Sequence, residues 1–165
     1  MKNYDQRFDD PAIKCSPANI IFGWTHDQHV NEITQKADSM TLKFGYMDYV
    51  RTIHIGGQHP KSISPGLGGH SLAKWEGDVL VVDTTGFKPG VLVPLSGMMH
   101  SGQLHLEERF TLDAAAGRLT RTYKGEDPLY WKTSYTGSDV MVLSKEPYVP
   151  YACKELSGKN NQRPK

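Results

Sequence analysis

The chain has 165 residues, a length that fits one domain built around one hydrophobic core. Its formal net charge is +1, and its lysines and arginines are interleaved with acids, which argues against nucleic acid as the main partner. No apolar run approaches the roughly 18 to 20 residues that a membrane-spanning helix needs. The 16 glycines and 10 prolines divide the chain into the short segments that are typical of an all-β domain.

An irregular N-terminal arm of about 30 residues precedes the first predicted strand. Alternating apolar and polar residues, bounded by turn residues, predict strands over 31–35, 39–44, 48–55, 71–75, 79–85, 104–112, 118–124, 129–136 and 140–144. Residues 79–82 are apolar on both faces, so that strand should be central. Most of these strands are joined by short hairpin turns, and the turn between the last two falls at 137–139.

Two longer Gly/Pro-rich segments interrupt this pattern, at 56–69 and 87–100. The best helical signal is a short turn over 96–103, and the polar tail over 157–165 is expected to be disordered. Together these features predict a small antiparallel β-barrel of lipocalin type, which could hold one small ligand, with a β-sandwich as the alternative.

The chain contains two cysteines, Cys15 and Cys153, one near each end. A disulfide between them would close a very long loop and would indicate an oxidising compartment. Two buried free thiols in a cytosolic protein are the alternative. The sequence favours the disulfide and therefore a periplasmic or secreted protein. The polar first residues do not have the pattern of a signal peptide. A mature form whose original start has been replaced would look the same, so these residues do not decide the compartment.

The most informative stretch is 98–109, because it places Glu108 on the apolar face of a predicted strand. The residues that share this face are Leu104, Leu106, Phe110 and Leu112. A carboxylate there is costly to bury unless it pairs with a cation, binds a metal or keeps a proton at a raised pKa. Arg51, on an apolar face of its own strand, could neutralise Glu108 in a purely structural ion pair or could orient an anionic substrate.

Histidine gives a second signal, because five of the seven histidines lie between residues 54 and 105. They are His54, His59, His70, His100 and His105. Loops held by a rigid sheet are common places for sites. A histidine near neutrality could exchange protons with Glu108 or with Asp83, which follows the central apolar run. The same five histidines could instead bind a divalent transition metal such as zinc or copper, although their spacing fits no tight metal signature.

The catalytic candidates are therefore Glu108, His105, His70, His100, Arg51 and Asp83. The candidates for substrate contact are His59, His54, Tyr49, Trp75, Met99 and Trp131. Methionine beside a histidine would form an adaptable apolar rim, and aromatic side chains would suit an apolar or aromatic ligand.

Two sequence blocks resemble a family of small, exported bacterial β-proteins with no established activity. The first is Gly69-His-Ser-Leu-Ala-Lys-Trp-Glu-Gly-Asp-Val-Leu-Val-Val-Asp-Thr84, and the second runs from His100-Ser to Leu104-His-Leu-Glu-Glu-Arg-Phe110. The resemblance covers about residues 10–155. It implies that seven residues belong to recurring motifs, which are His59, His70, Asp83, His100, His105, Glu108 and Arg109. It does not choose between catalytic and structural roles.

The function expected from the sequence is general acid–base catalysis without a cofactor, by a lyase, isomerase or hydratase. Its substrate would be a small, largely apolar molecule inside the barrel, with Glu108 as the acid or base. The alternatives are a non-catalytic protein that binds an apolar ligand and a metal-dependent enzyme with a histidine-rich site. A small molecule is the expected partner, and a homodimer stays open.

Overall fold

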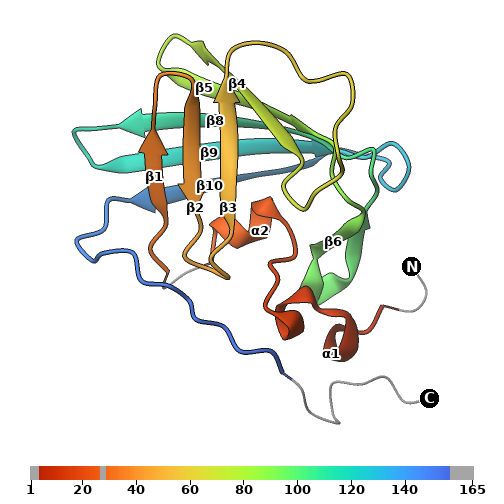
Figure 1. Ribbon diagram of the computed structural model, residues 1–165. Coiled ribbons are helices and arrows are strands. Elements are labelled where there is room, and N and C mark those ends of the chain that lie inside the picture. The colour runs from red at the N-terminus through yellow and green to blue at the C-terminus, as the bar shows by residue number, and fades with distance from the viewer. Residues whose placement is uncertain (1–3, 27–28, 157–165) are drawn as a thin grey trace.

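The computed structural model describes residues 4–26 and 29–156. Its main feature is a mixed sheet of eight strands in the order β1-β2-β3-β4-β5-β8-β9-β10, curled into a half-barrel (Figure 1). In this view β1, β2 and β3 cross in front of β8, β9 and β10, so the two ends of the sheet face each other across the core. A separate hairpin of β6 and β7 lies beside the sheet.

The strands of the sheet are β1 Glu32–Gln35, β2 Ser39–Lys43, β3 Val50–Ile55, β4 His70–Glu76, β5 Val79–Thr85, β8 His105–Asp113, β9 Arg118–Glu126 and β10 Tyr135–Val142. The smaller hairpin consists of β6 Gly90–Val93 and β7 Met98–His100. The helical segments are α1 Gln6–Asp9, η1 Pro11–Lys14, α2 Ile20–Trp24 and η2 Pro94–Ser96. None of the helices within the described ranges is long and apolar enough to cross a membrane.

The prediction of a closed antiparallel barrel is wrong in two respects, because the sheet is open and one of its strand pairs is parallel. Strands β3 and β4 run in the same direction, with His54 opposite Leu72. Two adjacent parallel strands need a long connection, because the chain must return to the side at which the first strand began. The Gly/Pro-rich segment 56–69 is that connection between β3 and β4. The remaining neighbours in the sheet are antiparallel, and β5 is central as predicted.

In β3 and β8 alternate residues are buried, as the alternating sequence predicts, whereas all four residues of β1 are exposed. In β8 the residues Leu106, Glu108 and Phe110 are buried, whereas Glu107 is exposed. Helix α2 packs into the concave side of the sheet and contributes Ile20, Ile21 and Trp24 to the core. The interior is therefore filled by side chains of the strands and of α2.

The N-terminal arm is more regular than the sequence predicts. Its described part forms α1, η1 and α2, and each begins at a side chain that accepts backbone N–H groups, which are Asp5, Asp10 and Asn19 respectively. These helices are four or five residues long, too short for a periodic apolar pattern to reveal them. The expected helical turn over 96–103 is replaced by η2 and β7, and the expected disordered tail over 157–165 lies outside the described residues.

The predicted final hairpin is also wrong, because 135–142 forms one strand that pairs with β9 along its whole length. Asp139 lies opposite Arg121, at the place where the sequence suggests a turn. The two side chains form an ion pair, with Arg121 Nε 2.8 Å from an Asp139 oxygen. A contact between distant segments thus overrides the local turn signal of Gly137-Ser138.

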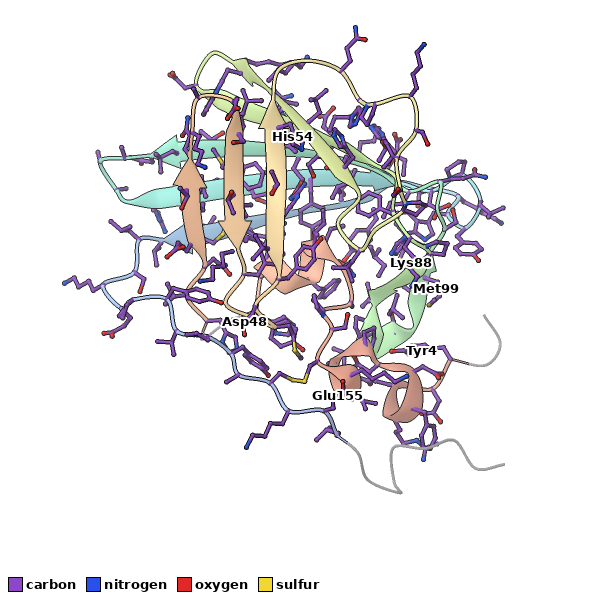
Figure 2. The ribbon with its side chains drawn as sticks, viewed as in Figure 1. Tyr4, Asp48, His54, Lys88, Met99 and Glu155 are labelled. Atoms are coloured by element: carbon purple, nitrogen blue, oxygen red, sulfur yellow. A yellow bond between two sulfur atoms is a disulfide. The ribbon has the colours of Figure 1, made fainter. Side chains whose placement is uncertain are left out.

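The disulfide between Cys15 and Cys153 is present, as the sequence favours, and it joins residues that are 138 positions apart. It attaches the extended C-terminal segment to the N-terminal arm near η1, where Figure 2 shows it as a yellow bond. The Leu156 N–H also donates to the Ile13 carbonyl, so the two terminal segments are joined by a covalent bond and a hydrogen bond.

Replacing both cysteines with serine should lower the free energy of unfolding by on the order of 4–5 kcal/mol, because the unfolded chain regains the entropy of a very long loop. Urea unfolding of the C15S/C153S variant and of the oxidised protein would measure this difference. A loss below about 1 kcal/mol would show that the bridge constrains little in the unfolded state.

Candidate functional site

Glu108 lies at the centre of the core and is fully buried. It forms an ion pair with Arg51 of β3, and Arg121 Nη1 of β9 lies 3.3 Å from its other oxygen. Arg51 also donates to Ser71 and Thr84, at 3.0 Å each. The buried carboxylate therefore has cationic partners on two other strands, and the ion-pair interpretation of the sequence is confirmed.

The expectation that Glu108 has a raised pKa is wrong. Burial by itself would raise its pKa, but the positive charges of Arg51 and Arg121 outweigh that effect and hold the pKa below its ordinary value. The ionised form of Glu108 is thus favoured, both of its oxygens are engaged, and it is poorly suited to donate or accept a proton during catalysis.

The sequence analysis missed Arg121, although the alternation of 118–124 would place it on the inner face with Leu119 and Tyr123. Arg121 is completely buried and also donates to the Ile21 carbonyl of α2, at 3.1 Å. Its positive charge is shared between Glu108 and Asp139, so two arginines and two carboxylates balance each other in this network. The sequence analysis identified Arg51 as an arginine on an apolar face, but the predicted turn at 137–139 hid Asp139, the partner of Arg121 in β10.

The opposite, outer face of the same strands carries a cluster of histidines around one carboxylate. His54 comes from β3, His70 from β4, Asp83 from β5 and His105 from β8. His54 and Asp83 lie on the two sides of Leu72 in one cross-strand row, since Leu72 is opposite both residues. His59 reaches the cluster from the connection between β3 and β4. We refer to His54, His59, His70, Asp83 and His105 as the His–Asp cluster.

Hydrogen bonds connect four of these side chains. His59 Nε2 lies 2.8 Å from one oxygen of Asp83, and His105 Nε2 contacts the other oxygen. The second ring nitrogen of His59 lies 2.8 Å from Nδ1 of His70. The fifth member, His54, stacks on His70 with ring centroids 5.1 Å apart and an interplanar angle of 13°.

The chemistry of the groups decides which atoms carry protons. An ionised Asp83 can only accept, so His59 and His105 each present an Nε2–H group to it. In a neutral His59 the other nitrogen, Nδ1, is then an acceptor for the Nδ1–H of His70. This arrangement leaves the Nε2 lone pair of His70 and the Nδ1 lone pair of His105 as two proton acceptors that share one carboxylate.

The surroundings of His70 favour its neutral form. Partial burial lowers its pKa below the ordinary value of 6.5, and the nearby His59 and His54 lower it further because they disfavour another positive charge. The cluster is nevertheless open to solvent, since the side chains of Asp83 and His105 are 42% and 44% exposed. A proton acceptor that is neutral at physiological pH and reachable from outside is what general base catalysis requires.

His100 does not join this cluster. It is buried at the end of β7, where its ring lies edge-on to Phe87 and its Nδ1 is 3.1 Å from the Ser101 carbonyl. Next to it, the buried Asp127 accepts from the Ser101 hydroxyl, at 2.9 Å. Asp127 was not identified from the sequence, and this arrangement fixes the connection between β7 and β8.

The other expected substrate contacts lie in separate places. Tyr49 packs against Phe44 at 5.5 Å, and Trp75 is half exposed near the end of β4. Trp131 donates its indole N–H to the Met99 carbonyl, at 2.9 Å, so these two residues stabilise each other. None of these four residues lines the cavity that the N-terminal and C-terminal segments form.

No group of three or more histidine, cysteine, aspartate or glutamate side chains in the described ranges is arranged to hold a metal ion. In the His–Asp cluster, both nitrogens of His59 and both oxygens of Asp83 are engaged in hydrogen bonds within the cluster. Comparison with protein-family models, with curated proteins and with solved structures finds no match. The resemblance to an exported bacterial family therefore stays a prediction from the sequence blocks.

Replacing Glu108 with glutamine should reduce the free energy of unfolding by about 3–5 kcal/mol, because it leaves the buried guanidinium of Arg51 without an anionic partner and that of Arg121 with Asp139 alone. The folded-state pKa of Glu108 is lowered, so its contribution is present above about pH 4.5 and is lost as the pH falls below that value. Urea unfolding between pH 7 and pH 3 would show wild type and variant converging in acid. The exposed neighbour variant E107Q is the matched control, and an equal loss in both variants would contradict the ion-pair assignment.

The NMR titration of His70 should give a pKa below 6.5, and a His54→Ala substitution should raise it, because a neighbouring positive charge and part of the burial are removed. His29→Ala, in another part of the molecule, serves as the control and should leave His70 unchanged. A His70 pKa at or above 6.5 in the wild-type protein would contradict the arrangement.

Proposed function

We propose that the protein is an enzyme that transfers protons to and from a small molecule, as a lyase, isomerase or hydratase does, and that the His–Asp cluster carries out this chemistry. The observation that supports the proposal is the pair of imidazoles bound to the two oxygens of Asp83. A carboxylate behind an imidazole fixes its tautomer and orientation and stabilises the imidazolium that forms when the ring accepts a proton.

The roles follow from position. His70 accepts a proton at its free Nε2, and His59 and Asp83 stabilise the charge that develops. His105 is the second acid–base group on the same carboxylate. Once its Nδ1 has taken a proton from solvent, it can deliver that proton to a different atom of the substrate, and His70 then releases its own proton to solvent. Asp83 is a positioning residue, because it acts through both rings. The charged residues of the ion network, Arg51 and Glu108, contribute by holding the strands in register.

The location of the cluster favours a polar substrate over the apolar one expected from the sequence. Exposed charged groups surround it on the outer face, among them Glu107 opposite Asp83 and Glu126 opposite His105. A polar molecule can replace water at such a surface at little cost, whereas an apolar molecule gains little burial there. The disulfide supports a periplasmic or secreted location, since such bonds persist in oxidising compartments.

Hydrogen–deuterium exchange next to a carbonyl group tests this proposal, because removal of such a proton begins many lyase and isomerase reactions. In D₂O the protein should exchange the carbon-bound hydrogens of dihydroxyacetone, as followed by proton NMR. Asp83→Asn and His70→Gln should each slow the exchange by roughly 10²–10⁴-fold, whereas Glu155→Gln, an exposed position in the C-terminal segment, should keep the wild-type rate. Exchange no faster than that of free imidazole at equal concentration, or an unchanged rate in D83N, would refute the proposal.

A further inference from the structure

A second part of the molecule has the features of a binding site, away from the His–Asp cluster. A cavity of about 790 Å³ lies where the N-terminal and C-terminal segments meet, and no member of the cluster lines it. Its volume falls in the range of sites that hold small molecules. Cys153 lines it, so the disulfide is part of its wall.

Aromatic side chains form one side of this cavity. Tyr46, which follows β2, and Tyr151, in the C-terminal segment, both line it and meet edge to face with ring centroids 5.3 Å apart. His26 stacks on Tyr46 at 3.7 Å, and His29 packs against Tyr151 at 5.1 Å. Met47 adds an adaptable apolar contact. Such a wall favours a planar aromatic ring, which can stack or pack edge-on against the tyrosines.

One basic side chain at the cavity has no anionic partner among the described residues. Its acidic member, Asp10, already accepts the Ala12 N–H at 2.9 Å, and Arg7 is paired with Asp5 at 2.7 Å. Lys154 also lines the cavity, and among residues 4–26 and 29–156 it makes no ion pair. An ammonium group without an anionic partner, at a cavity that also has an aromatic wall, is suited to the carboxylate of an aromatic acid.

The backbone around the cavity is unusually constrained. Four non-glycine residues in the described ranges adopt left-handed φ angles, and all four lie at its wall or directly beside it: Cys15, Met47, Asp48 and Ala152, at 53°, 61°, 53° and 50°. Such conformations persist only where the surrounding structure enforces them, and they concentrate at sites that hold ligands. Here the Asp48 carboxylate accepts the Tyr151 N–H, at 3.0 Å, and the Tyr148 hydroxyl (Asp48 is labelled in Figure 2).

We propose that this cavity binds a small aromatic carboxylate, with its ring against Tyr46 and Tyr151 and its carboxylate paired with Lys154. The site is independent of the proposed catalytic function, because it shares no residue with the His–Asp cluster. The disulfide and the Asp48 hydrogen bonds hold its two sides together, so the cavity is built before the ligand arrives.

Isothermal titration calorimetry with 1-naphthoate tests the proposal on the oxidised full-length protein. We expect saturable 1:1 binding with a dissociation constant below about 1 mM, and a weakening of about tenfold or more in Lys154→Gln. Lys145→Gln is the matched control, because Lys145 belongs to the same C-terminal segment but does not line the cavity, and it should bind as wild type does.

Two further titrations test whether the naphthoate binds at this cavity and through its carboxylate. The uncharged analogue 1-naphthalenemethanol should bind more weakly than 1-naphthoate to the wild-type protein and equally to wild type and K154Q. Asp83→Asn should leave naphthoate binding unchanged, which separates this site from the catalytic proposal. The proposal is overturned if naphthoate shows no saturable binding, or if K154Q binds it as tightly as K145Q does.

Discussion

The structure depends on one buried anion. Glu108 lies in the middle of a curled sheet, and its charge is neutralised by arginines from β3 and β9. Because a buried carboxylate without cations is very costly, the chain folds stably only when these strands are in the register that brings the partners together. Arg121 extends the same constraint to Asp139 of β10 and to the carbonyl of Ile21 in α2.

This interior network directly supports the outer cluster. Ser71 and Thr84 receive hydrogen bonds from Arg51 inside the core, and their neighbours in sequence, His70 and Asp83, point to the other face. Successive residues of a strand alternate between faces, so fixing the inner residue fixes the outer one. The ion network therefore determines where the histidines stand, although it takes no part in the proton transfer that we propose.

Much of this arrangement could be predicted from the sequence, because period-two alternation is a local property. It placed Glu108 and Arg51 on inner faces and His105 on an outer one, and it found the hairpin that positions Asp83. The parallel pairing of β3 and β4 could not be predicted, since it depends on the path of a long connection. The contact between His59 and Asp83 could not be predicted for the same reason, because it depends on the path of that connection and on no sequence spacing.

The errors also have physical causes. The turn signal at 137–139 is strong locally, but pairing with β9 and the ion pair to Arg121 give that segment more stabilisation as a strand. The sequence placed the chemistry on Glu108 because it could show that the carboxylate is buried but not how many cations surround it. Because two arginines engage Glu108, we assign the acid–base chemistry to His70 and His105, which keep an accessible ring nitrogen.

The central claim concerns the proton positions in the His–Asp cluster, and long-range ¹H–¹⁵N correlation spectra of the histidine rings measure them directly. Near neutral pH the account predicts that His59 and His105 carry their protons on Nε2, while His70 is neutral with its proton on Nδ1. Rings that exchange freely between both tautomers, as imidazole in water does, would contradict it.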